Sequence, residues 1–519
     1  MGLVPPGESR LTSCDGSSRC SSAGTALRGR WVWGALWLAL AAGCLAPAVL
    51  NRYPVAFGDT VNYLVAAHEF RPTHERAFGY GAFLRAAGGL WSLWLPAAAQ
   101  AALSAALAVR LLSLEAPRWP ARWRTFLAAA FVAALLAGHL PWQASFVMPD
   151  VFAGIMVLAL LLLSEHWTRL PVWERALVAA VLGGAATVHL THPPLMLALA
   201  AGAAAFSAAA VPRFSSAAAL LPRARRTAAL ALAAAVFGWG ALVAANFGTY
   251  REAVASRGSS VFLFARLQSD TDAPRILRPF CEAGAGFAIC RYLDRLAADR
   301  PTVDGFMWDF GRYALLPDLG WVAGFYEEAR VLDRILLREG WRDWLAASAR
   351  RTAEQSVDFQ LGDGMDRGGL SVLPDVLPGQ GMPAAGAALA STRQAVDGLV
   401  PLMPRSVAGG LATAGLLGLL GLFAWGAARA RPDVWWPALL FLFAWVGNAA
   451  LIALGGDVHG RYGARLVWVA PLLAGVLALR AAPRVPKPVD AHGLAGAWTG
   501  SPNLHRPGEA AVVAPEGRP

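Results

Sequence analysis

Long apolar stretches alternate with short polar connections along most of the chain. Several of the stretches are short for a bilayer, so the count can differ by one or two and a pair can be re-entrant. The pattern predicts an all-α polytopic membrane protein with about ten transmembrane helices. The stretches are 31–50, 87–113, 125–141, 149–164, 174–191, 194–211, 227–246, 407–428, 434–454 and 464–481.

Residues 247–406 break this pattern, because they are rich in charge. Within them, 327–355 carries apolar residues at roughly helical spacing. The last third, "LGDGMDRGGLSVLPDVLPGQGMPAAG", is rich in Gly and Pro and is expected to form irregular loops. We expect a mostly helical domain inserted between the seventh and eighth spans. The predicted organisation is a disordered tail at 1–30, membrane domains at 31–246 and 407–481, the inserted domain at 247–406 and a disordered tail at 482–519.

Arginines mark every second connection between the apolar stretches. By the positive-inside rule these connections face the cytoplasm, so both termini lie inside and 247–406 lies outside. Nearly all basic residues are arginine and alanine is abundant, a bias typical of a high-GC bacterium. We therefore expect a multi-pass protein of the bacterial cytoplasmic (inner) membrane with a periplasmic or otherwise extracytoplasmic loop. The arginines are Arg28, Arg30, Arg118, Arg122, Arg124, Arg169, Arg175, Arg213, Arg223, Arg225, Arg226, Arg429, Arg431, Arg480 and Arg484.

Composition agrees with a membrane protein and disfavours two other classes. The 519 residues are 56% hydrophobic and 15% charged, with a mean hydropathy of +0.45, which is too apolar for a soluble protein of two or three domains. The net charge of +11 sits in short clusters rather than on one face, so no nucleic-acid partner is expected. Neither a Walker A motif nor a dinucleotide-binding glycine motif is present.

Two cysteines lie nine positions apart in the predicted extracytoplasmic domain. An oxidising compartment favours a disulfide between Cys281 and Cys290. The alternative is two unpaired buried thiols. A zinc site is disfavoured, since no other Cys or paired His accompanies them.

Four groups of polar residues stand at the predicted outward ends of the spans. Asp59 follows the first span in "GDTVNYL", and Asp150 precedes the fourth in "FVMPDVFAG". Both positions also suit a carboxylate that caps a helix N-terminus. His189 and His192 flank a tight turn, where interfacial histidines are common. The fourth group is Asp457, His459, Arg461 and Tyr462 in "GGDVHGRYGARL".

These segments, with "AFGYGAFLRAAGGLWSLWLPAAAQAALSAALAVRLL", resemble the GT-C superfamily of membrane glycosyltransferases, including protein O-mannosyltransferases and lipid A aminoarabinose transferases. The resemblance covers roughly 31–211 and 434–481 and leaves 247–406 unmatched. It assigns Asp59 to the acidic position of the first outer loop, and Arg461 with Tyr462 to a late Arg-Tyr position. Many members have two adjacent acids in that loop, whereas here Gly58 precedes Asp59.

The resemblance implies transfer of a sugar from a polyprenyl-phosphate donor within the membrane lipid to a glycan, lipid or protein acceptor. Asp59 is the expected catalytic residue, either as the base for an acceptor hydroxyl or as the holder of a divalent metal. Arg461 would bind the donor phosphate. Asp150, His192, His459 and Tyr462 complete the expected substrate-binding set.

Two other functions remain open. A non-enzymatic envelope assembly protein would use 247–406 as its binding module. A membrane transporter is less favoured, because the centres of the apolar stretches are almost wholly Ala, Leu, Val and Gly.

Overall fold

The computed structural model describes residues 18–210, 220–309, 311, 314–370 and 373–483. Every regular element in these ranges is a helix, and an isolated parallel β-bridge joins Val55 to Phe146. Up to Arg480 the chain forms one compact unit. The tail predicted at 482–519 lies almost entirely outside the described ranges.

Helices coincide with all ten apolar stretches. They are α1 (Ser18–Gly43) with α2 (Ala46–Asn51), α5 (Trp94–Glu115), α6 (Arg124–Ala137) with α7 (Leu140–Ser145), α8 (Val151–His166), α9 (Val172–Thr187), α10 (His192–Ala210), α11 (Leu221–Tyr250), α22 (Arg405–Ala428), α23 (Pro432–Gly455), and α24 (Gly460–Val467) with α25 (Val469–Ala481). The first helix begins at Ser18, so part of the stretch predicted as a disordered tail is helical.

Six helical segments within the described ranges are long and apolar enough to cross a membrane, judged by length and composition. Several such helices are typical of a membrane-embedded protein. Helix α8 and residues 192–208 are apolar but shorter, and the total of ten spans stays a prediction. The six segments are Trp31–Asn51, Trp94–Arg118, Leu221–Tyr250, Arg405–Ala428, Pro432–Gly455 and Gly460–Ala481.

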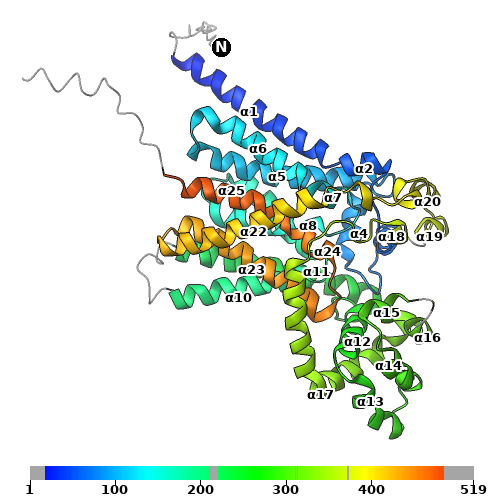
Figure 1. Cartoon of the computed structure of the whole chain (residues 1–519). Helices are drawn as coiled ribbons and strands as arrows, with labels where there is room; N and C mark the ends of the chain where they lie inside the picture. Colours follow the sequence, from blue (N-terminus) through cyan, green and yellow to red (C-terminus); the bar gives the residue numbers. More distant parts are fainter. Residues whose placement is uncertain (1–17, 211–219, 310, 312–313, 371–372, 484–519) are drawn as a thin grey trace, which may run out of the picture. The chain divides into compact units, whose positions relative to one another are not determined.

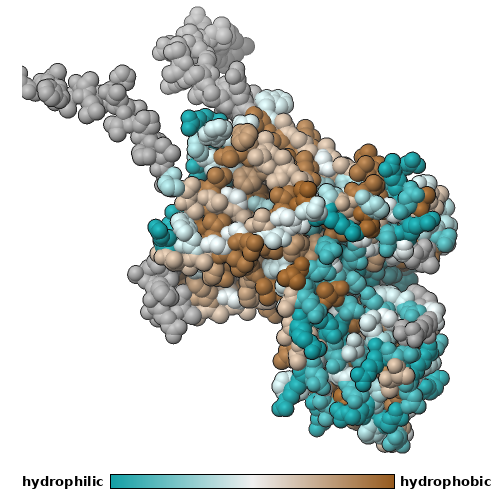
Figure 2. All heavy atoms as spheres, in the orientation of Figure 1, coloured by the Kyte–Doolittle hydropathy of each residue, from teal (hydrophilic) through white to brown (hydrophobic). Residues whose placement is uncertain are grey.

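Exposed hydrophobic side chains mark the surface of these helices. Figure 2 shows hydrophobic residues over the bundle that contains α1, α6, α22 and α23, and mostly hydrophilic residues over α12 to α17. A contiguous apolar surface of this kind needs a partner, and for helices of this length lipid is that partner. Among the exposed residues are Trp31, Leu38, Phe126, Phe237, Leu417 and Val446.

The charge-rich part of the chain folds around one long helix, α17 (Trp321–Val357) (Figure 1). Buried side chains of the shorter helices share one hydrophobic cluster with the first half of α17. We call this part the α12–α17 segment. Its other helices are α12 (Gly258–Asp270), α13 (Ala273–Glu282), α14 (Leu293–Asp299), α15 (Val303–Trp308) and α16 (Leu315–Asp318).

The irregular loops predicted after α17 are partly wrong, because four short helices form there. Pro383 begins one of them, where its fixed φ suits a first turn. The Thr392 side chain accepts a hydrogen bond from the Ala395 amide and caps another. Helix α19 buries Leu373 and Leu377, and α20 buries Leu389. The four are α18 (Arg367–Leu370), α19 (Leu373–Gly379), α20 (Pro383–Ala390) and α21 (Arg393–Val396).

Cys281 and Cys290 form a disulfide, with 5.6 Å between their Cα atoms. We expect both cysteines to resist thiol alkylation in intact cells until a reductant is added. Closing so short a loop constrains the unfolded chain and contributes about 2 to 3 kcal/mol. Labelling of both thiols without reductant would contradict the pairing.

Candidate functional site

Two loops that are far apart in sequence lie side by side and aim the two predicted acids at one place. The parallel bridge joins Val55 to Phe146, with Val55 N donating to Ser145 O at 3.0 Å and Val147 N donating to Val55 O at 2.8 Å. Asp59 follows Val55 by four residues, and Asp150 follows Phe146 by four. The bridge therefore anchors the two loops side by side four residues before each acid. Both acids stand at the starts of helices, α3 (Thr60–Glu69) and α8, and both line the cavity described below.

The late Arg-Tyr pair reaches the same place on α24. A Cβ at Gly463 would lie 2.1 Å from Asp358 O, and one at Gly460 would lie 2.6 Å from Gln360 O. Only glycine therefore lets the start of α24 pack against the backbone that follows α17. This close approach fixes the position of Arg461.

Asp59 is not a helix cap. It occupies the N-cap position of α3, but its side chain accepts no capping hydrogen bond. Its Oδ1 instead accepts a hydrogen bond from Arg76 Nη2, and its Oδ2 lies 3.9 Å from Arg461 Nη2. Two guanidinium groups therefore hold this carboxylate. Its side chain is 16% exposed, so solvent still reaches it.

Asp150 does not cap its helix either, although it stands at the N-cap position of α8. It is buried, and its Oδ1 lies 3.9 Å from Arg465 Nη1 without a hydrogen-bond donor. Arg465 is fully buried and donates from Nε to Asn448 Oδ1 at 3.0 Å. The capping interpretation therefore fails for both acids.

Arg461 has unused donors. Its Nη2 donates to the Tyr462 hydroxyl at 3.0 Å, and its guanidinium carbon lies 4.1 Å from the centre of the Phe57 ring. Nε and Nη1 are buried and have no hydrogen-bond acceptor. Buried donors of this kind are costly unless a ligand or water meets them.

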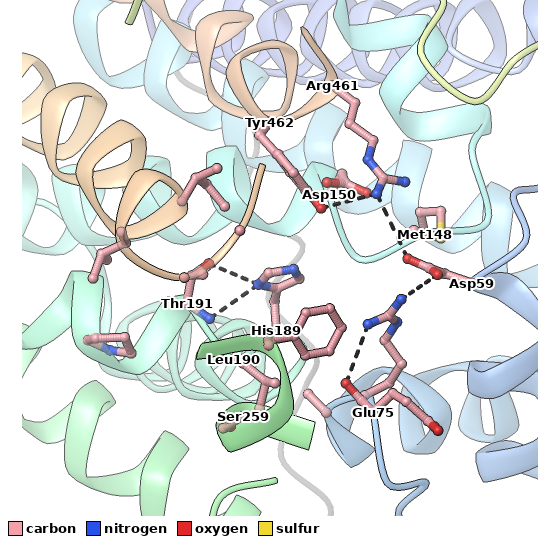
Figure 3. Close-up of a pocket in the computed structure, with 18 of the residues that line it drawn as sticks. Asp59, Glu75, Met148, Asp150, His189, Leu190, Thr191, Ser259, Arg461 and Tyr462 are labelled. Carbon is pink, nitrogen blue, oxygen red and sulfur yellow. Dashed lines mark hydrogen bonds and ion pairs between the residues drawn. The ribbon is translucent and has the colours of Figure 1, made fainter. Parts of the chain in front are cut away.

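One cavity of about 260 Å³ collects these groups. Figure 3 shows Arg461 and Tyr462 entering from one side and Asp59 from another, with His189 facing them. Burial raises the pKa of Tyr63 far above its usual range, so this lining residue is a neutral phenol. The polar lining is Asp59, Tyr63, Glu75, Arg76, Asp150, His189, Thr191, Ser259, Arg461 and Tyr462, and the apolar lining includes Met148, Leu190, Pro194, Phe262, Leu451 and Ile452.

The residues around Asp59 do not fit a divalent metal, which is the alternative to a general base at this position. No group of three or more His, Cys, Asp or Glu side chains in the described ranges is placed to hold one. Asp59 faces Arg76 and Arg461 instead. Two guanidinium groups at one carboxylate repel a cation there.

No family model, curated protein or solved structure matches this chain. The chemistry of the site therefore depends on its own geometry.

Of the two histidines in the tight turn, His189 lines the cavity and His192 does not. His192 begins α10, is fully buried, and its Nδ1 lies 2.6 Å from Ala185 O on α9. His189 precedes the helix, and its Nδ1 lies 2.8 Å from Thr191 Oγ1. The substrate-binding role expected of His192 thus has no support from its position.

Asp457 and His459 lie outside the cavity lining. Asp457 Oδ1 accepts a hydrogen bond from Arg266 of α12 at 2.6 Å. His459 Nε2 lies 3.0 Å from Asp304 Oδ2, and its Nδ1 lies 3.3 Å from Asp363 Oδ2. Asp363 Oδ2 is also 3.7 Å from Arg461 Nε. His459 therefore links Asp304 of the α12–α17 segment to Asp363, which lies beside Arg461.

Burial and hydrogen bonding have opposing effects on the pKa values of His459 and Asp363. Burial alone would lower the pKa of His459, but its hydrogen bonds to Asp304 and Asp363 raise that pKa to about 10. Burial would raise the pKa of Asp363, whereas the hydrogen bond from His459 and the charge of Arg461 lower it below its usual value. Both groups are charged at neutral pH.

We expect the stabilisation from His459 to depend on pH with a definite sign. A folded-state pKa above the unfolded value of about 6.5 gives stabilisation that is complete below pH 6.5 and is lost as pH rises towards about 10. The difference in unfolding midpoint between wild type and His459→Gln should therefore shrink over this window. A difference that grows with pH would contradict the charged link.

Three charged residues at the site escaped prediction from the sequence: Arg76, Glu75 and Asp363. Arg76 lies between α3 and α4 (Phe78–Ala86), in the predicted outer loop 51–86, where Arg71 and Arg85 look equally suitable from the sequence. Asp363 falls in the stretch expected to be irregular. The one available signal was the composition of "THERAFGY", which places a base and an acid in the same outer loop as Asp59.

Proposed function

We propose that this chain is a membrane glycosyltransferase of the bacterial inner membrane that uses a polyprenyl-phosphate-linked sugar. One observation carries the proposal: the Asp59 carboxylate and the Arg461 guanidinium lie 3.9 Å apart in a shared cavity, and Asp59 does not cap its helix. A base and a phosphate-binding cation at this separation are what sugar transfer from a phosphate requires.

The reaction assigns one task to each group. Asp59 accepts the proton of an acceptor hydroxyl as that oxygen bonds to the anomeric carbon of the sugar. The bond from the sugar to the phosphate breaks, and the electron pair leaves with the phosphate. Arg461 holds that phosphate through its guanidinium, in which Nη1 and Nε have no hydrogen-bond acceptor in the protein. Its shift towards the phosphate also weakens its hold on Asp59 and leaves the base free for the acceptor.

The apolar part of the cavity suits the lipid portion of such a donor. Pro194 begins the apolar part of α10, and Leu451 and Ile452 lie near the end of α23. Both helices present hydrophobic side chains, so an isoprenoid chain can pass from the cavity into the surrounding lipid. We assign the cavity to the outer face of the membrane from the arginine pattern of the connections.

Deleting the gene and comparing envelope lipids and glycans by mass spectrometry tests the proposal. We expect one sugar to disappear from an envelope component, the unused lipid-linked donor to accumulate, and the wild-type gene to reverse both changes. Unchanged envelope glycans and lipid-linked sugars would reject a transferase and favour the assembly role.

A further inference from the structure

Arg76 is the unusual member of the cavity. It comes from the first polar loop, its side chain is 12% exposed, and it donates from Nη2 to Asp59. Its Nε is buried without an acceptor. The cavity therefore holds two arginines, Arg76 and Arg461, that contact the same carboxylate and keep spare donors.

The α12–α17 segment holds Arg76 in place with aromatic rings. The guanidinium carbon of Arg76 lies 5.4 Å from the ring centre of Phe262 on α12 and 5.3 Å from that of Trp308 on α15. Contacts of this length are cation–π interactions. Phe262 also lines the cavity, so this segment supplies part of the wall.

The charges in the cavity leave room for an anion. Two guanidinium groups of the lining, on Arg76 and Arg461, face the Asp59 carboxylate. The Asp150 carboxylate lies 3.9 Å from a third, that of Arg465, which is fully buried behind the lining. The third lining acid, Glu75, accepts a hydrogen bond from Trp321 Nε1 at 2.9 Å, and Figure 3 shows its carboxylate turned away from Asp59. Asp363 is next to Arg461 but is balanced by His459.

We propose that Arg76 and Arg461 together form a two-guanidinium site for a phosphate group, which takes the place of a divalent cation in this cavity, and that Phe262 and Trp308 position Arg76. The inference rests on the proposed function in naming the donor phosphate as the anion. Binding of a lipid phosphate, however, is measurable without any transfer.

This arrangement makes Asp59 a competitor of the phosphate for both arginines. Removing the carboxylate should therefore tighten phosphate binding even as it prevents transfer. A metal-dependent site gives the opposite sign, because there the carboxylate holds the cation that holds the phosphate.

The test uses the full-length chain in detergent with EDTA, farnesyl phosphate as the probe and farnesol as its uncharged counterpart. We expect farnesyl phosphate to raise the unfolding midpoint clearly more than farnesol, which lacks the phosphate, with Mg²⁺ or Mn²⁺ altering the affinity less than about twofold. Arg76→Gln should weaken binding by about tenfold or more, and Arg76→Lys by less, because lysine keeps the charge but loses the fork. Trp308→Leu should weaken it by about threefold.

The matched control is Arg71→Gln, in the same loop, where Arg71 is about half exposed and pairs with Glu69. It should bind farnesyl phosphate as wild type does. If Arg76→Gln fails to fold, Asp59→Asn decides, since tighter binding supports the two-guanidinium site. Binding that requires a divalent metal, weaker binding in Asp59→Asn, or unchanged binding in folded Arg76→Gln would overturn it. Unchanged envelope glycans in the deletion strain would reject the transferase and leave this binding result standing.

Discussion

Asp59→Asn should abolish sugar transfer while leaving the protein folded and inserted. Asparagine keeps the size of the side chain and an oxygen that can accept from Arg76, but it cannot take a proton from an acceptor hydroxyl. Loss of a positioned general base lowers a rate by about 10²- to 10⁴-fold. The measurement is complementation of the deletion strain, with membrane levels of the variant checked by immunoblot.

A substitution at an acid outside the cavity is the control for the loss of one negative charge. Asp294 is about 90% exposed and pairs with Arg278, away from the cavity. Asp294→Asn should therefore complement as wild type does. Full activity of Asp59→Asn would show that the acid serves only the structure of the loop.

Of the substitutions discussed for this protein, Arg480→Met should lower the free energy of unfolding the most. Arg480 Nη2 lies 2.8 Å from Glu115 Oε1, and Nη1 lies 3.4 Å from Glu165 Oε2. Glu115 is fully buried. Removing one partner of a buried ion pair costs about 3 to 5 kcal/mol when the other charge is left buried without compensation. Glu115 keeps its ion pair with Arg118, so we expect a loss at the lower end, about 3 kcal/mol.

The unfolding midpoint in detergent measures this effect. Arg429→Met, at an exposed arginine after α22, should change stability by no more than about 0.5 kcal/mol. Adding Glu115→Gln to Arg480→Met should recover part of the loss by removing a stranded charge. Equal midpoints for Arg480→Met and Arg429→Met would show that Arg118, which already pairs with Glu115, is enough to compensate that acid.

The helices were the most predictable part of the fold, because a long apolar stretch has few other structures available in lipid. The short helices after α17 were not predictable from glycine and proline content. Their starts depend on single positions such as Pro383 and Thr392. The overall content of glycine and proline does not reveal which single positions can begin a helix.

The two acids of the site could be predicted from the sequence, but the residues that contact them could not. Asp59 and Asp150 drew attention because each stands beside an apolar stretch. Nothing local indicates the bridge between Val55 and Phe146 that brings them together, since it is a single β pair in a helical protein. The choice of His189 over His192 depends on where α10 begins, and helix ends are the least certain feature of a sequence prediction.

The role of Arg76 could not be predicted from the sequence either. Several arginines in its loop could have reached Asp59. The choice among them is made by Phe262 and Trp308, which lie almost two hundred residues or more further along the chain. Contacts between such distant segments are a property of the folded chain that one sequence does not reveal.

The most direct test of the central claim is release of polyprenyl phosphate by the purified chain. Full-length wild type and Asp59→Asn, reconstituted in lipid nanodiscs, would receive the lipid-linked sugars and envelope acceptors extracted from the deletion strain, with EDTA present. We predict that wild type releases polyprenyl phosphate, detected by mass spectrometry, and that Asp59→Asn releases at least about 100-fold less. No release by wild type, or equal release by the two proteins, would contradict the assignment of Asp59 and Arg461 to sugar transfer.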